Sequence, residues 1–177
     1  MQAVLTVPGI GNSEPGHWQS IWERRYSGVT RVMQRDWEQP VCSEWAAAVE
    51  EAVATSAQPP VIVAHSLGCL AVAHWAFSSA RMVAGLVLVA VPDPEGPNFP
   101  AAAKGFAPTP PGVRGRRALI ISSSDDHYSN ARWSRQLAEA YRAQLIELTN
   151  AGHINVASGF GEWQEGWNHV SAFVGHR

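Results

Sequence analysis

The segment Ala64-His65-Ser66-Leu67-Gly68 follows a run of apolar residues and precedes an alanine-rich stretch. This pattern is typical of a nucleophile elbow, the sharp turn from a buried strand into a helix that exposes a serine hydroxyl. Small residues are needed two positions before and after the serine, because larger side chains would collide with the neighbouring strand and helix. Gly68 meets this need, and Ala64 departs from it by one methyl group. A serine that only caps a helix needs neither small neighbours nor a buried strand before it, so the pattern favours Ser66 as a nucleophile.

A serine hydroxyl becomes a strong nucleophile when a base takes its proton and an acid orients that base. In folds that contain a nucleophile elbow, the acid and the histidine follow the serine along the chain, each after a later strand. Asp125 and Asp126 follow the apolar run 118–122, and His153 follows the run 143–148 after a short loop. The pattern predicts His153 as the base, while the spacing leaves both aspartates open as the acid.

The negative charge that develops on a reacting carbonyl oxygen must be stabilised by two N–H groups. One is expected from the backbone of Leu67, directly after the nucleophile, and the other from Ile10 in the loop 7–13. Gly9 and Gly11 flank Ile10 and allow the backbone to approach a substrate closely. A phosphate-binding loop is the alternative for this segment, but the third glycine and the lysine of such loops are missing.

The other histidines lack the placement of His153. His65 lies beside Ser66 in a tight turn and is expected to be a packed or hydrogen-bonded residue. We expect surface or packing roles for the rest, which are His17, His74, His127, His169 and His176. No group of histidine, cysteine and aspartate residues has the spacing of a metal site, and the serine chemistry requires no cofactor.

Short apolar runs alternate with longer amphipathic stretches along the chain, which predicts an α/β fold with helices on both faces of a mostly parallel sheet. The predicted strands are 3–7, 30–34, 61–64, 85–91, 118–122 and 143–148. The predicted helices are 43–56, 67–79, 130–142 and 162–174. Ser66, the two aspartates and His153 all follow such strands, so parallel strands would bring them to one edge of the sheet.

The segment 92–112 is rich in proline and too long for a simple connection. Its apolar residues Phe99 and Phe106 favour a cap that lies over another part of the protein, and both are candidates for substrate binding together with Gly9 and Gly11. A mobile surface loop is the alternative.

Length and composition limit the class of protein. The chain has 177 residues, 46% of them hydrophobic and 16% charged, with a net charge of -2. These values predict one domain over residues 1–177, with no nucleic acid and no membrane as a partner. Cys42 and Cys69 do not make a disulfide framework. The apolar run 3–7 is too short for a signal peptide or a membrane span, so the cytoplasm is the expected location.

The chain resembles the small single-domain serine hydrolases typified by human retinoblastoma-binding protein nine and its bacterial relatives. The matching segments are Val7-Pro8-Gly9, His17-Trp18-Gln19, Asp36-Trp37, the elbow around Ser66, Ser124-Asp125-Asp126 and Gly152-His153. This resemblance implies that Asp126 is the acid and that Asp125 supports its loop. It also implies the strand order 2-1-3-4-5-6, with the first strand between the second and third. Asn130 departs from the pattern, because the family usually has a proline there.

We therefore expect a carboxylesterase-like serine hydrolase that cleaves a small-molecule acyl substrate through an acyl-enzyme, with Ser66, His153 and Asp126 as catalytic residues. Amide and thioester bonds remain open. The alternatives are a peptidase or acyltransferase with the same three residues, and a protein-binding module on a hydrolase scaffold, which would imply a protein partner.

Overall fold

Runs of valine, leucine and isoleucine form a six-stranded parallel sheet in the computed structural model, which describes residues 2–175. Its order is β2-β1-β3-β4-β5-β6, which confirms the predicted fold class and strand order. The strands are β1 (Val4–Val7), β2 (Val29–Arg31), β3 (Val61–His65), β4 (Gly85–Val89), β5 (Ala118–Ser123) and β6 (Gln144–Leu148). The central strands are buried on both faces, which explains why their sequences are continuously apolar rather than alternating.

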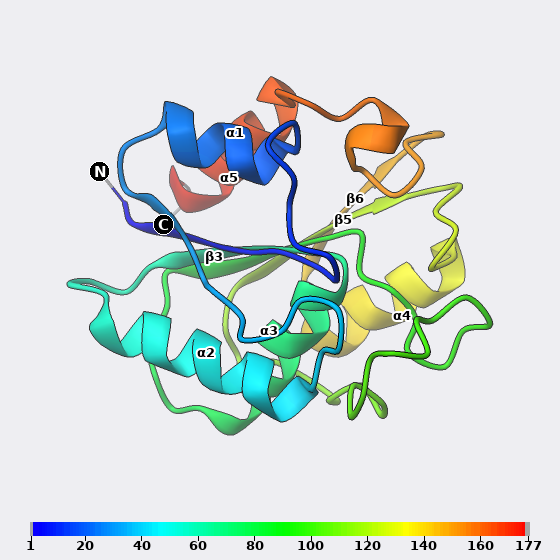
Figure 1. Cartoon of the computed structure of the whole chain (residues 1–177), viewed down its shortest axis with the longest axis horizontal. Helices are drawn as coiled ribbons and strands as arrows, with labels where there is room; N and C mark the ends of the chain where they lie inside the picture. Colours follow the sequence, from blue (N-terminus) through cyan, green and yellow to red (C-terminus); the bar gives the residue numbers. More distant parts are fainter. Residues whose placement is uncertain (1, 176–177) are drawn as a thin grey trace.

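Helices cover both faces of the sheet, as Figure 1 shows: α1 and α5 lie on one face, and α2, α3 and α4 on the other. Their bounds are α1 (Trp18–Arg25), α2 (Cys42–Thr55), α3 (Leu67–Ser78), α4 (Ala131–Tyr141) and α5 (Gln164–Gly175). A 3-10 turn, η1 (Val156–Ser158), precedes α5. Among the helices that the structure describes, none is long and apolar enough to cross a membrane.

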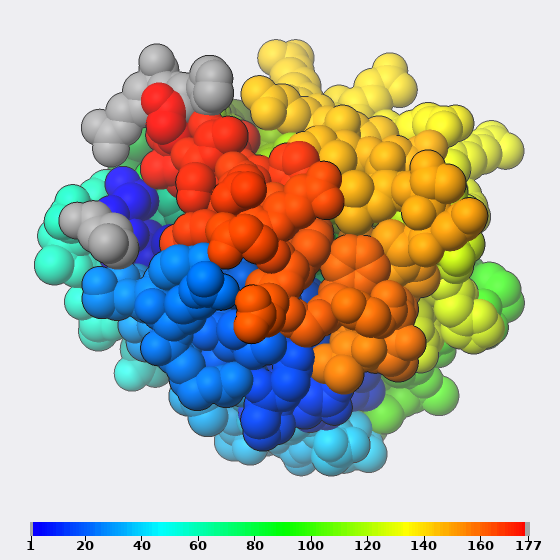
Figure 2. Space-filling model, turned by 90° about the horizontal axis from the view of Figure 1, so that it is seen from above, coloured from blue at the N-terminus to red at the C-terminus, as the bar shows by residue number. Residues whose placement is uncertain are grey.

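Helix α1 was not predicted, because it is short and half of its residues are strongly polar, so that its only apolar positions are Trp18, Ile21 and Trp22. Both indole rings are buried against the sheet. Figure 2 shows the outer surface of this face, where α1 and α5 lie side by side. The rings of Tyr26 and Trp167 stack between the two helices with their centroids 3.8 Å apart. The tryptophans of this chain thus hold a short helix that its local pattern does not specify.

The strand order of the sheet reverses at β1: the chain adds β2 on one side of β1 and then adds β3 to β6 on the other side. The connections therefore leave β1 and β3 in opposite directions, and a crevice opens outside the carboxyl ends of these two strands. The sheet thereby places the loop after β1 and the elbow after β3 next to each other.

Candidate active site

Ser66 lies in the turn between β3 and α3 with φ 54° and ψ -129°, a conformation that residues with side chains rarely adopt. Its backbone N–H donates to the carbonyl of Val89 at 2.9 Å, which ties the turn to β4. The hydroxyl makes no capping hydrogen bond to α3. The local geometry is therefore that of the predicted elbow, and the simple helix-cap interpretation does not describe this serine.

Two glycines allow the elbow to form. A Cβ atom at Gly68 would collide with the carbonyl oxygens of Val7 and Pro8, the latter at 2.5 Å, because α3 begins directly against the end of β1. A Cβ atom at Gly9 would lie 2.9 Å from the Cβ of Ser66. The loop after β1 therefore approaches the serine more closely than any residue with a side chain would permit.

His153 connects Ser66 to Asp126. Its Nε2 lies 2.8 Å from the Oγ of Ser66, and its Nδ1 lies 2.9 Å and 3.0 Å from the two carboxylate oxygens of Asp126. The Asp126 side chain is fully buried, while that of His153 keeps 12% of its surface exposed. The N–H of Tyr128 donates to Asp126 at 2.9 Å and helps to fix its orientation. These contacts can pass a proton from the serine hydroxyl to the imidazole while a buried carboxylate orients the ring.

Asp125 has different partners from its neighbour. Its carboxylate accepts the hydroxyl of Ser123 at 2.7 Å and the N–H of Gly152 at 2.8 Å. These hydrogen bonds, that of Ser123 first, hold the pKa of Asp125 below its ordinary value. The Ser123 hydroxyl oxygen also accepts the N–H of Ala151 at 3.0 Å. Hydrogen bonds from the end of β5 and the residues after it thereby hold the backbone just before His153.

His65 supports the same loop from the other side, and its N–H at Nε2 donates to the carbonyl of His153 at 2.9 Å. Burial, followed by the nearby His153 and His17, holds the pKa of His65 well below its ordinary value. A neutral ring with its proton on Nε2 meets this hydrogen bond. His65 is thus a buried, hydrogen-bonded residue, as expected from its position in the turn.

The two expected oxyanion donors both line the cavity in front of Ser66. Leu67 is the first residue of α3, so its N–H has no partner within the helix. The loop N–H groups after Ile10 are engaged, since Gly11 donates to Trp37 and Asn12 to Gly9. The N–H groups of Leu67 and Ile10 have no acceptor among the residues that the structure describes.

The cavity at Ser66 has a volume of about 320 Å³. Its lining residues are Gly9, Ile10, Gly11, Asn12, Glu14, His17, His65, Ser66, Leu67, Pro92, Pro100, Tyr128, His153 and Asn155. The segment 92–112 therefore contributes two prolines to the wall. A larger hollow lies between α2 and α3, but none of the residues that surround the serine belongs to its lining.

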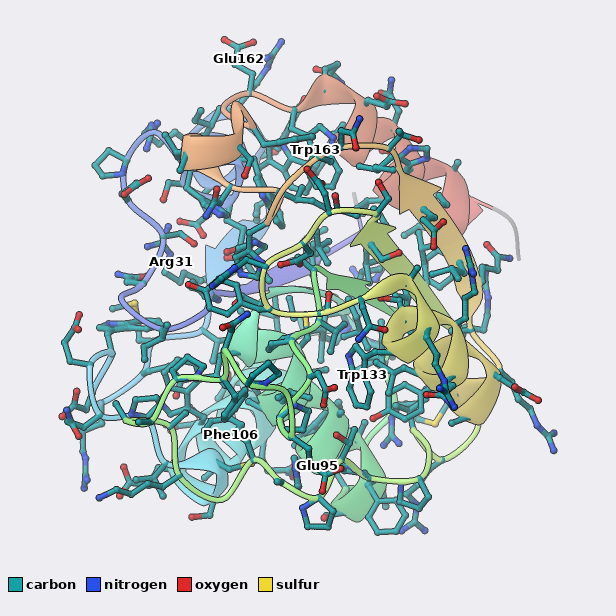
Figure 3. All side chains as sticks on the ribbon, turned by 90° about the vertical axis from the view of Figure 1, so that its right-hand side faces the viewer. Arg31, Glu95, Phe106, Trp133, Glu162 and Trp163 are labelled. Atoms are coloured by element: carbon teal, nitrogen blue, oxygen red, sulfur yellow. The ribbon has the colours of Figure 1, made fainter. Side chains whose placement is uncertain are left out.

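The expectation that Phe99 and Phe106 line the site is wrong, because neither ring belongs to this wall. Phe106 is 1% exposed and meets the ring of Trp45 at a centroid distance of 6.1 Å. It lies on the side of the sheet that carries α2 and α3 (Figure 3). Phe99 packs against the same core cluster. Packing against the apolar core removes the Phe106 ring and part of the Phe99 ring from water, which a place in a small polar cavity would not do.

Sequence reasoning missed several residues in the wall. Tyr128 places its ring 4.6 Å from that of His153, and Glu14 and Asn155 complete the rim. His17, expected at the surface or in packing, is 5% exposed and lies in the wall of this cavity. The segment that carries His17 was one of those that matched the family, and this was the available signal. Of the remaining histidines, none that the structure describes reaches the cavity, and His176 lies outside the described residues.

Metal chemistry has no candidate ligands here: within residues 2–175, no three His, Cys, Asp or Glu side chains are grouped so that they could hold a metal ion.

Comparisons with solved structures show the same fold. A protein described as a YdeN-like hydrolase, from Pectobacterium atrosepticum, is 29% identical with a TM-score of 0.86, covering 98% of this chain and 91% of its own. The ydeN gene product of B. subtilis is 20% identical with a TM-score of 0.76, and the match covers 98% of both chains. The monoacylglycerol lipase of Paleococcus ferrophilus is 14% identical with a TM-score of 0.72, covering 98% of this chain and 94% of its own.

No curated protein sequence matches the chain. The sequence profile of the serine hydrolase family, in contrast, matches residues 4–172, nearly the whole length. Elbow, sheet order and profile agree, and the chain belongs to the serine hydrolase family.

Proposed function

We propose that this protein hydrolyses carboxylic esters of small molecules through an acyl-enzyme on Ser66. The observation that carries the proposal is the continuous line of contacts from Ser66 Oγ through His153 to the buried Asp126, at 2.8 Å and 2.9 Å. Ser66 and His153 both line the cavity, where a substrate can reach the serine hydroxyl.

In the first half of the reaction, the Ser66 oxygen attacks the acyl carbon while His153 Nε2 takes the hydroxyl proton. The carbonyl oxygen becomes negatively charged, and the N–H groups of Leu67 and Ile10 stabilise it. When the tetrahedral intermediate collapses, the bond to the leaving oxygen breaks and His153 gives its proton to the departing alcohol. Asp126 stabilises the transient imidazolium through Nδ1.

In the second half, water attacks the acyl carbon and His153 takes one of its protons. The bond to Ser66 then breaks, the serine oxygen recovers the proton from His153, and the carboxylic acid leaves. Every proton is returned, so the cycle needs no metal ion or other cofactor.

The size and charge of the cavity favour small neutral substrates. A volume of about 320 Å³ lies at the lower end of ligand sites. Its lining residues include the carboxylate of Glu14 and no lysine or arginine. A negatively charged group on a substrate would therefore find no cationic partner there.

Labelling with a fluorophosphonate probe tests the proposal, because such probes react with activated serines. Wild-type protein should be labelled and should hydrolyse p-nitrophenyl esters of short acids, while Ser66→Ala should do neither. Absence of labelling in the wild type, or equal labelling of the variant, would favour the protein-binding module instead.

A substrate panel separates the remaining alternatives, which use the same three residues. Faster cleavage of aminoacyl amides than of esters would indicate a peptidase. Transfer of the acyl group to an added alcohol in preference to water would indicate an acyltransferase.

A further inference from the structure

His17 carries a polar atom that the proposed reaction does not use. The residue is 5% exposed, and its buried Nε2 has no hydrogen-bond partner within residues 2–175. A buried donor without an acceptor is destabilising by about 1–3 kcal/mol, so such a donor in the wall of a cavity is a place where a bound water or a ligand oxygen supplies the partner.

The surroundings of His17 fix which ring nitrogen holds the proton. Nδ1 accepts the backbone N–H of Gln19 at 3.2 Å, in the position of a cap on α1. Burial first, and then the charge of Arg31 and the nearby His153, lowers the pKa of His17 to about 4. The ring is therefore neutral near neutral pH, with a lone pair at Nδ1 and its hydrogen at Nε2.

The position of this donor distinguishes it from other buried polar atoms. In the part of the chain that the structure describes, eight side chains have a buried nitrogen or oxygen without a partner. Only His17 among them belongs to the wall of the cavity at Ser66. Its ring centroid lies 4.8 Å from that of His65, whose own Nε2 is already occupied by the His153 carbonyl.

We propose that the N–H of His17 Nε2 donates to a neutral oxygen of the bound substrate, separate from the ester that reacts. The protein would then prefer esters that carry an additional ether, carbonyl or hydroxyl oxygen in the acyl or the alcohol part. His17 belongs to the cavity wall and the torsion χ2 of histidine is soft, so the ring has the freedom to turn Nε2 towards a bound oxygen. This inference rests on the ester hydrolysis proposed above.

Two substitutions at position 17 separate substrate binding from helix capping. His17→Asn keeps an acceptor near the place of Nδ1 but has no donor at the place of Nε2. His17→Gln keeps a donor near the place of Nε2 but loses the cap. Thermal unfolding of both variants reports the loss of the cap independently of activity.

Matched esters differ by one oxygen in place of one methylene group. In the acyl arm, p-nitrophenyl methoxyacetate is compared with p-nitrophenyl butyrate. In the alcohol arm, methoxyethyl butyrate is compared with butyl butyrate. The quantity measured is the ratio of kcat/KM within each pair, so intrinsic differences in reactivity cancel between wild type and variants.

In one of the two arms, His17→Asn should lower this ratio about tenfold, as expected for one hydrogen bond. His17→Gln should keep a ratio near that of wild type although it unfolds at a lower temperature. The arm that responds identifies the part of the substrate that His17 contacts. Unchanged ratios in both arms, or equal changes in the two variants, would overturn the inference and indicate a structural role only.

A binding experiment decides the inference separately from turnover. In Ser66→Ala protein, imidazole nitrogen NMR should show the His17 proton on Nε2. Methyl methoxyacetate should shift this resonance, and methyl butyrate should not. Equal shifts with both esters would reject the inference. Hydrolysis by Ser66→Ala at the wild-type rate would instead reject the proposed function.

Discussion

Two adjacent aspartates have separate partners at the end of β5. Asp126 is buried and contacts Nδ1 of His153, while Asp125 is exposed and contacts Ser123 and the N–H of Gly152. Only the first can stabilise positive charge on the imidazole by direct contact. The second acts on the backbone that precedes His153, so it is a positioning residue.

Asp126→Asn should lower kcat/KM for p-nitrophenyl acetate by about 10⁴-fold, because the amide cannot stabilise the imidazolium or hold the correct tautomer. Asp125→Asn should lower it by no more than about tenfold, because the hydroxyl of Ser123 and the N–H of Gly152 both donate to the same oxygen, Oδ1, which the amide oxygen of asparagine can replace. Steady-state kinetics with both purified variants checks this difference. Comparable losses would show that the two carboxylates share the catalytic role.

Helix α3 and the loop after β1 position the nucleophile and the oxyanion donors together. The first turn of α3 contains Leu67 and Gly68, and the loop contains Gly9 and Ile10. The two segments touch through glycines, with no side chain between them. Their relative placement is therefore set by backbone contact, which leaves little room for adjustment.

Gly68→Ala should be destabilising by about 1–3 kcal/mol or more, because the added methyl group meets the backbone carbonyls of Val7 and Pro8. The shift should also displace Ile10 and lower kcat. Gly112→Ala is the matched control, since a Cβ atom there meets only the Ala140 carbonyl at the ordinary distance of 3.8 Å. Chemical denaturation and ester hydrolysis measure both effects. A Gly68→Ala protein with wild-type stability and kcat would contradict this account of the elbow.

At the scale of the whole molecule, buried neutral histidines link folding to pH. The pKa of His17 falls from 6.5 to about 4 on folding, and that of His65 also falls far below 6.5. The unfolded chain therefore binds more protons in this interval, and the free energy of unfolding must decrease as pH falls from 6.5 towards 4. Above 6.5 the contribution of both histidines is fully present.

The Tm should accordingly fall between about pH 7 and about pH 4.5, a window above the range in which ordinary carboxylates titrate. His17→Asn should make this fall smaller, because one of the two buried histidines is removed. Calorimetry of both proteins across this range, in buffers of matched ionic strength, checks the expectation. An identical pH dependence of Tm in the two proteins would show that His17 does not contribute.

Features that depend on neighbours along the chain could be predicted from the amino-acid sequence. Apolar runs predicted the parallel strands, and small residues around Ser66 predicted the elbow. The order of strands with an acid and a histidine after them predicted which loops meet. The strand order and the choice of Asp126 came from resemblance to a family, because spacing alone cannot rank two adjacent carboxylates.

Contacts between residues far apart in the chain could not be predicted in this way, because they depend on how the elements pack. Helix α1 is held by long-range contacts such as the indole N–H of Trp18, which donates to the Ile154 carbonyl at 2.9 Å, 136 residues away. The same packing brings His17 into the cavity wall and takes Phe106 into the core. Local patterns specify turns and elements, whereas burial of these residues depends on elements that are far apart in the chain and adjacent in space.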